Sequence, residues 1–244
     1  MLKNEKNHYT RCYIAFLDLL GFKSMIGKTS CQDILDIFTD MKNPLASIKI
    51  GNGESQAEIP AVKQIQTKVM SDSICFFIDA ELQDALFCLL CCCAAFQAKL
   101  LNRPIPILVR GAIVLGDVFS EGDIIFGSGI TNAYLLEEGN AKYPRIIITK
   151  ETLMNGLKNI SRTSIKQNVD VYAFCDSDKY YVANWLGFFF DMASVKNKES
   201  NEVRYHKLSA YIDSILGSET NASIREKYLY LDATLSKYFD EKLR

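Results

Sequence analysis

Two acidic residues, Asp18 and Asp72, stand where ionised side chains are unusual. The run Tyr13–Leu17 (YIAFL) is apolar and rich in β-forming residues, so it predicts a buried strand that ends directly before Asp18. Asp72 lies in the short segment SDS between VKQIQTKVM and SICFFI, which predict a hairpin with this acid at its tip. Carboxylates are rarely buried unless they are paired or bound to a metal ion. Both acids are therefore candidates for chemistry.

A hairpin placed beside the first strand would bring the carboxylates of Asp18 and Asp72 together. Two like charges that converge repel each other unless a cation lies between them. Mg²⁺ and Mn²⁺ meet that demand, because they bind through a few carboxylates plus substrate phosphates. The alternatives are structural: Asp72 could shape the turn, and Asp18 could cap the helix that follows.

Other catalytic systems find little support in the sequence. Only two histidines occur, His8 in a polar N-terminal arm and His206 in a charged helix, and neither follows a strand as a nucleophile system would require. No phosphate-loop lysine motif is present. The GSG at Gly127–Gly129 lacks the remaining glycine of the dinucleotide fingerprint.

The cysteines predict neither disulfides nor a zinc site. Four of the eight lie within ALFCLLCCCAAF, which has no turn residues and no second ligand cluster to complete a tetrahedral site. Their pattern predicts small apolar residues in a buried helix. Free thiols in this number favour a reducing compartment.

The composition predicts a globular cytoplasmic protein. The chain has 244 residues, of which 48% are hydrophobic and 23% charged, with a net charge of −1. Near-neutral charge disfavours nucleic acid or an anionic membrane as a partner. The longest uncharged apolar run, Ala85–Phe96, is too short to span a bilayer, and MLKNEKNHYTR lacks the apolar core of a signal peptide.

The patterned segments predict an α+β domain. Up to residue 158 they follow the order β-α-β-β-α-β-(β)-α-β-α, which favours helices on one face of a mostly antiparallel sheet. Residues 179–190 predict a further strand or buried segment, and helical periodicity follows from about residue 200. We expect an N-terminal arm at residues 1–12, a main domain at residues 13–190, and a helical extension at residues 191–244 packed on it.

Four stretches resemble, in order along the chain, the landmarks of class III nucleotidyl cyclases: FLDLLGF, KVMSDSICFF, VRGAIVLG and FGSGITNAYLLEE. Those landmarks are a first-strand Asp followed by a Gly-Phe turn, a hairpin Asp, a strand Arg-Gly, and a Phe-Gly leading into a helix. The resemblance covers about Tyr13 to Thr149. It implies a ferredoxin-like βαββαβ core with helices packed on the sheet, followed by C-terminal helices, and makes residues 13–190 the catalytic domain.

Within that superfamily the sequence is most similar to the stand-alone pyrimidine cyclases of bacterial anti-phage (Pycsar) systems. NAYLLEE resembles their Ala-Tyr-x-Leu-Glu segment, and REKYLYLDATLSKYFDEKL resembles their C-terminal helix. The resemblance implies that UTP, or CTP, is converted to cyclic UMP or cyclic CMP and pyrophosphate. The product would be a messenger of antiviral defence that acts on a separate effector protein.

The resemblance also implies a role for each matching position near the metal. Asp18 and Asp72 would hold two divalent cations, Mn²⁺ or Mg²⁺, with the carbonyl of Leu19 as a further ligand. Arg110 would bind the β- and γ-phosphates, for which a planar guanidinium is suited. A surface ion pair is the alternative for Arg110.

The remaining matching positions would bind the substrate. The turn formed by Leu20, Gly21 and Phe22 would offer backbone N–H groups to the triphosphate, and a glycine there permits close approach. Lys68, four residues before Asp72, matches the position that contacts the base in purine cyclases, although it could also just balance charge. Tyr134 would line the pocket, with a core or helix-face position as the alternative.

The sequence departs from purine cyclases on the helix after Gly127. Thr131 and Leu135 stand where those enzymes carry an Asn and an Arg, and Asn132 is one residue out of register. Lys23, in GFK, replaces the usual Thr and is a possible extra phosphate contact. Pyrimidine cyclases also depart at these helix positions, so the resemblance favours them.

The family places its active site between two protomers, so the resemblance implies a homodimer. Two other readings stay open. One is an adenylate or guanylate cyclase of unusual sequence, which Lys68 permits. The other is a catalytically inactive cyclase-fold module for dimerisation or binding, against which the retention of both Asp18 and Asp72 argues.

Overall fold

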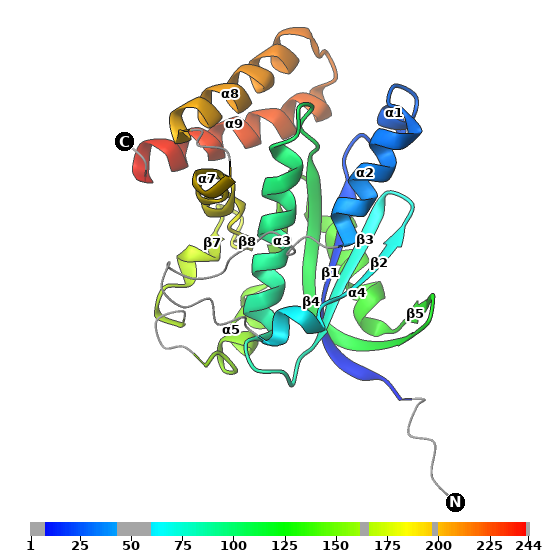
Figure 1. The fold of residues 1–244 in the computed structure, drawn as a ribbon. Coiled ribbons are helices and arrows are strands. Elements are labelled where there is room, and N and C mark those ends of the chain that lie inside the picture. The colour runs from blue at the N-terminus through cyan, green and yellow to red at the C-terminus, as the bar shows by residue number, and fades with distance from the viewer. Residues whose placement is uncertain (1–7, 43–59, 162–165, 197–199, 243–244) are drawn as a thin grey trace, which may run out of the picture.

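The computed structural model describes residues 8–42, 60–161, 166–196 and 200–242 (Figure 1). Its centre is a sheet in which seven strands follow the order β2-β3-β1-β4-β6-β8-β7, while β5 pairs with β4 alone. Among the described strands, only the pairing of β4 with β6 is parallel. The strands are β1 (Thr10–Leu19), β2 (Gln66–Met70), β3 (Ser73–Asp79), β4 (Val109–Glu121), β5 (Ile124–Phe126), β6 (Ile146–Ile148), β7 (Ala173–Cys175) and β8 (Tyr181–Ala183).

Helices lie on both faces of this sheet (Figure 1). The α-helices are α1 (Phe22–Ile26), α2 (Cys31–Lys42), α3 (Ala85–Leu101), α4 (Ser128–Asn140), α5 (Lys150–Leu157), α7 (Trp185–Lys196), α8 (Asn201–Ser218) and α9 (Ala222–Lys242). Short 3₁₀ turns occupy Pro60–Gln64 and Val169–Val171. The prediction of an α+β fold with a mostly antiparallel sheet is confirmed, but helices on one face only is wrong, because α4 covers the opposite face.

The helix α3 forms the centre of the hydrophobic core on one face of the sheet. Every residue from Ala85 to Leu101 except Lys99 is buried, and the helix packs against alternate residues of β1 and β3, such as Leu17 and Phe76. All eight cysteines are free, and burial raises the pKa of Cys88 to about 12. The α3 thiols are therefore small apolar groups in a packed helix, as the sequence predicted.

The helix α4 approaches the opposite face closely because both surfaces carry glycine. A Cβ on Gly116 of β4 would lie 2.5 Å from the Cα of Gly129, and one on Gly129 would lie 2.5 Å from Cδ1 of Ile14. Ala133, one turn further along α4, is completely buried. These small residues allow α4 to lie directly on β1 and β4, beside the strand end that carries Asp18.

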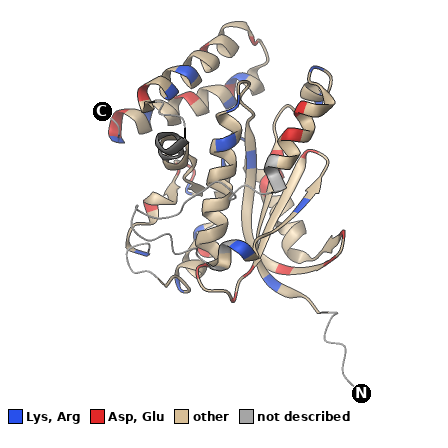
Figure 2. Ribbon diagram, in the orientation of Figure 1, with Lys and Arg blue, Asp and Glu red and all other residues tan. Residues whose placement is uncertain are grey.

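The C-terminal helices pack onto the end of α3. Apolar side chains of α7, α8 and α9 join Ala98 and Leu101 of α3 in a separate cluster that includes Trp185, Leu208 and Leu235. Figure 1 shows α8 and α9 side by side at the end of the molecule away from the N-terminus. Both helices carry basic as well as acidic residues (Figure 2).

Several boundaries differ from those predicted. The strand β1 begins at Thr10, so it includes part of the predicted arm, whose residues 1–7 lie outside the described chain. The helix α1 follows Gly21 directly and was not predicted. Residues 179–190 contain β8 and then the start of α7, so the predicted boundary at residue 190 falls inside a helix. None of the described helices is long and apolar enough to cross a bilayer.

Candidate active site

The backbone brings Asp18 and Asp72 to the same end of the sheet. Asp18 pairs in register with Ser73 of β3, directly after the turn that holds Asp72. The N–H of Leu19 donates a hydrogen bond of 3.0 Å to the carbonyl of Asp72, which fixes the hairpin tip against the end of β1. The hairpin predicted from the sequence is present, and its tip lies beside the first strand.

Arg110 is the direct partner of Asp18 on the other neighbouring strand. The two residues are in register between β1 and β4, and Nε of Arg110 lies 3.1 Å from Oδ2 of Asp18. The Asp18 side chain is 18% exposed and that of Arg110 is 26% exposed. The acid at the end of the core strand is therefore paired, yet solvent or a ligand can reach it.

A third charged residue, Glu137 of α4, completes this group. Its Oε1 lies 2.7 Å from Nε of Arg110, and its side chain is only 3% exposed. Burial raises the pKa of Glu137 to about 7, although the charge of Arg110 acts in the opposite direction. The sequence interpretation gave Glu137 no role. The available signal was its spacing of four and eight residues from Ala133 and Gly129 on one helix face.

The turn after Asp18 has the backbone that its glycine allows. Gly21 has φ of +80°, a left-handed conformation that other residues rarely adopt, and α1 begins directly after it. The ring of Phe22 is buried and packs edge-on against Phe38. The N–H of Leu20 donates to the carbonyl of Leu108 at 2.9 Å, so contact of this N–H with a triphosphate requires that bond to open.

Lys68 lies on β2 and reaches across to the turn between β4 and β5. Its Nζ donates to the carbonyl of Gly122. It lines a hollow between β2 and β5 together with Thr67, Asp123 and Ile124, among others. The structure thus brings Lys68 to an open hollow, although its ammonium group is engaged by a backbone carbonyl.

The two candidate residues of α4 lie on the outward side of the helix. Tyr134 is 42% exposed and packs edge-on against Phe16, which lies on the same face of β1 as Asp18. Its hydroxyl is hydrogen-bonded to Glu138, which raises the pKa of Tyr134. Thr131, almost one turn earlier, is exposed. Both residues are accessible to a ligand approaching over α4.

The donor set at this strand end is compatible with a hard cation. It offers the carboxylates of Asp18 and Asp72 and the backbone carbonyl of Leu19, which are oxygen ligands of the kind that Mg²⁺ and Mn²⁺ prefer. Within the described ranges, no group of three or more His, Cys, Asp or Glu side chains could hold a metal ion by itself. A cation would therefore need substrate or water oxygens as well.

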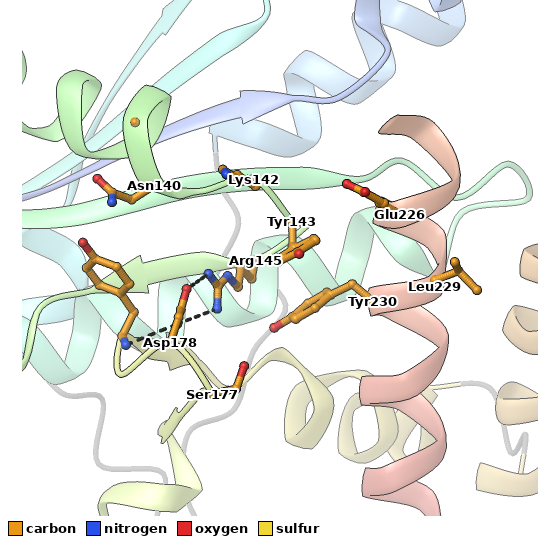
Figure 3. A pocket seen from close by; sticks show the side chains of 11 residues that line it. Asn140, Lys142, Tyr143, Arg145, Ser177, Asp178, Glu226, Leu229 and Tyr230 are labelled. Atoms are coloured by element: carbon orange, nitrogen blue, oxygen red, sulfur yellow. Dashed lines mark hydrogen bonds and ion pairs between the residues drawn. The ribbon is translucent and has the colours of Figure 1, made fainter. Parts of the chain in front are cut away.

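A second hollow lies between the end of α4, the β7–β8 turn and α9 (Figure 3). The rings of Tyr143 and Tyr230 stack there with centroids 4.6 Å apart, and the guanidinium of Arg145 lies 5.4 and 5.6 Å from them. Arg145 forms ion pairs with Asp176 and Asp178. Because the buried guanidinium of Arg145 is already paired with both acids, the hollow is a junction between segments rather than a candidate reaction site.

Comparison with known proteins identifies the fold through solved structures. No protein-family model and no curated protein matches the sequence. Among solved structures, the chain is similar to the monomeric guanylyl cyclase domain of the RhoGC fusion protein from the aquatic fungus Blastocladiella emersonii. The sequence identity is 11% and the TM-score 0.50, over 72% of this chain and 95% of that one.

Two further similar structures have lower scores. One is the catalytic core of a rhodopsin-guanylyl cyclase with converted specificity in complex with ATPalphaS (12% identity, TM-score 0.48, 72% of this chain and 96% of that one). The other is an adenylate/guanylate cyclase/hydrolase from Silicibacter pomeroyi (20% identity, TM-score 0.41, 64% and 84%). The likeness to the fungal domain shows that this chain has the fold of class III nucleotidyl cyclase domains.

Proposed function

We propose that this chain is a nucleotidyl cyclase that converts a pyrimidine nucleoside triphosphate, UTP or CTP, to the 3′,5′-cyclic monophosphate and pyrophosphate. The observation that carries the proposal is the meeting of Asp18, Asp72 and Arg110 at one end of a sheet with the class III cyclase fold. Acids that can hold a divalent cation, beside an arginine that can bind phosphate, form the donor set that a metal–triphosphate complex needs.

Each residue has a part in the proposed reaction. Asp18 and Asp72 would hold Mn²⁺ or Mg²⁺, with the Leu19 carbonyl as a further ligand. Two such cations, when bound, would supply activation of the ribose 3′-hydroxyl and neutralisation of the leaving pyrophosphate. Arg110 binds the β- and γ-phosphate oxygens, exchanging its contact with Asp18 for the substrate. Gly21 permits the turn to approach the triphosphate.

No side chain needs to act as a nucleophile. The 3′-oxygen attacks the α-phosphorus, the bond from that phosphorus to the bridging oxygen breaks, and pyrophosphate leaves with the electron pair. The hydroxyl proton passes to solvent. A histidine-poor site is adequate for this reaction, because catalysis consists of positioning and charge stabilisation.

The pyrimidine preference is supported by the resemblance of the sequence to stand-alone pyrimidine cyclases and by Thr131 and Leu135 in place of the Asn and Arg of purine cyclases. Lys68 beside Ile124 supplies one donor and an apolar wall on which a base could lie. UTP is favoured over CTP because uridylate cyclases are the commoner type. The product would act as a messenger for a separate effector in anti-phage defence.

A homodimer with its active site at the interface is part of the proposal. Exposed apolar side chains gather on the β5 and α4 side of the molecule, where Tyr9 packs edge-on against Phe126 and both rings remain about half exposed. Ile124, Tyr134 and Leu135 are also exposed there. A second copy of the chain would cover these side chains and close the hollow that Lys68 lines.

Two rivals keep specific support. A purine cyclase is compatible with Lys68 and with the similar fungal domain, which is a guanylyl cyclase domain by name. A catalytically inactive module is compatible with the ion pair between Asp18 and Arg110, since that pair gives Asp18 a structural partner in the absence of a metal ion.

The test is incubation of the purified chain with each of ATP, GTP, CTP and UTP in the presence of Mn²⁺, with chromatographic identification of the products. We expect cyclic UMP or cyclic CMP to dominate. Cyclic AMP or cyclic GMP as the main product would support the purine rival. The absence of a cyclic product from all four would contradict the proposed function and would favour the catalytically inactive module.

A further inference from the structure

The inward stripe of α4 ends in a carboxylate. Gly129, Ala133 and Glu137 are spaced by four residues and are the buried residues of this helix. The first two are small because β1 and β4 lie directly beneath them, as the short distances from a Cβ at Gly129 indicate. The third position, by contrast, holds an acid. Burying its charge costs free energy unless a positively charged group contacts it.

Arg110 is the cation that meets Glu137. Its Nε is 2.7 Å from Oε1 of Glu137 and 3.1 Å from Oδ2 of Asp18, so one nitrogen lies between two acids. No described group makes a well-aligned hydrogen bond to Oε1 of Glu137. The close contact with Arg110 is therefore the interaction that compensates the buried acid.

The two acids differ in how easily they can leave Arg110. Asp18 is 18% exposed at the open end of β1, where a cation can compete for its oxygens. Glu137 is 3% exposed and is held by a helix packed on the sheet through glycine and alanine. A metal ion that binds Asp18 and draws it away would leave Arg110 with Glu137 as its fixed partner.

We propose that Glu137 is a positioning residue that holds the guanidinium of Arg110 at the end of β4 when Asp18 turns to a divalent cation. This inference rests on the proposed function. Both acids contact Nε, so the two terminal nitrogens are the pair that can bind phosphate oxygens end-on. Without Glu137, Arg110 would keep its charge but lose the anchor that sets its direction.

The kinetic test compares Glu137→Gln with the wild type on the triphosphate that the wild type converts best. The amide keeps the shape but removes the charge, and we expect kcat/KM to fall by about 10- to 100-fold, as for other partners of catalytic groups. Most of the loss is expected in kcat, because Arg110 stabilises charge that develops on the leaving pyrophosphate. The matched control, Glu151→Gln on the exposed side of α5, is expected to remain within about twofold.

A kinetic cycle separates positioning from a general structural effect. If Glu137 acts through Arg110, Glu137→Gln will change kcat/KM by less than about twofold in the Arg110→Ala background. The same loss in both backgrounds, or wild-type kinetics in Glu137→Gln, overturns the inference. If the wild type makes no cyclic product, the proposed function itself fails and the positioning role fails with it.

A stability cycle tests the pair whether or not the chain is a cyclase. It is run at pH 8 without metal, above the pKa of about 7 that Glu137 has beside Arg110. In Arg110→Ala the acid is buried without its cation, so Glu137→Gln should shift Tm upward by at least about 3 °C more than it does in the wild type. Equal shifts in both backgrounds would show that the two residues are not coupled and would overturn the inference.

Discussion

At the scale of single residues, one arginine is shared between two acids. Asp18 and Glu137 each contact Nε of Arg110, from β1 and from α4, and Asp72 lies at the adjoining turn. Two carboxylates against one guanidinium, with a third acid at the adjoining turn, leave an excess of negative charge, which favours a metal cation at this end of the sheet. The pairing also explains how Asp18 is tolerated beside a buried strand.

The substitution Asp18→Asn should separate chemistry from stability. Arg110 keeps Glu137 as a partner, so we expect the free energy of unfolding to fall by only about 1 kcal/mol. Cyclase activity is expected to be lost, because the amide lacks the charge that holds a divalent cation. Chemical denaturation and product formation are measured on the same preparation, with Asp213→Asn on the exposed side of α8 as the control.

The titration of Glu137 predicts a pH dependence of stability in the metal-free protein. Its pKa is raised from 4.5 to about 7 in the folded chain by burial, so the folded state holds a proton that the unfolded state releases between these values. Stability from this group is full below pH 4.5 and is lost as pH rises through 7, by up to about 3 kcal/mol. The free energy of unfolding of the wild type and of Glu137→Gln, determined across this pH range, measures this loss. Parallel pH profiles would contradict the assigned shift.

At the scale of elements, the positions that follow from local pattern were predictable. The hairpin tip at Asp72 and the buried helix α3 agree with the structure because each depends on neighbouring residues only. The pairing of Asp18 with Arg110 depends on the register of strands more than 90 residues apart in sequence, which no local pattern fixes. The same holds for the contact of Lys68 with the Gly122 carbonyl.

The features that the sequence does not predict escape detection for physical reasons. The helix α1 is only five residues long and follows a left-handed Gly21, so its apolar periodicity is too short to detect. Glu137 has no assigned role in the sequence analysis because acids normally lie on the outward face of a helix, and its spacing from Ala133 and Gly129 is the one sequence signal that it faces inward. The helix α7 begins within an aromatic run that also suits a strand.

The close contact of α4 with β4 predicts opposite effects of two Gly→Ala substitutions. Gly116→Ala places a methyl group 2.5 Å from the Gly129 backbone, which must move α4 and with it Glu137. We expect a loss of about 1–3 kcal/mol in stability and a loss of activity. Gly139→Ala, on the same helix with open space around it, should instead stabilise by about 0.5–1 kcal/mol. Thermal unfolding of both variants gives the answer, and two equal shifts would rule out the close-packing explanation.

At the scale of the whole molecule, the C-terminal helix α9 is connected to the sheet through the junction around Arg145. The hydroxyl of Tyr230 donates a hydrogen bond of 2.6 Å to Asp176, which follows β7. Burial alone would raise the pKa of Asp176, but hydrogen bonds from Tyr230 and the Ser177 backbone, with the charge of Arg145, lower it below 3.8. The junction therefore links three segments distant in sequence through one ionised acid.

The substitution Tyr230→Phe tests this junction. It keeps the stack on Tyr143 and removes only the hydroxyl, so we expect stability at pH 7 to fall by about 1–2 kcal/mol. The stability that Asp176 contributes is present above pH 3.8 and is lost as pH falls through its lowered pKa, so the difference between variant and wild type should shrink in acid. Denaturation at pH 7 and pH 3 measures both effects. An unchanged stability at pH 7 would mean that the hydroxyl does not anchor α9.

The most direct test of the central claim is the comparison of the wild type with Asp72→Asn. Asp72 lies at a turn that asparagine also favours, so the variant should fold as the wild type does. With UTP or CTP and Mn²⁺, the account predicts one cyclic pyrimidine monophosphate per pyrophosphate from the wild type. It predicts at least about a 100-fold lower rate from Asp72→Asn, whose thermal unfolding should be unchanged. Equal rates from the two proteins, or no cyclic product from the wild type, would contradict the account.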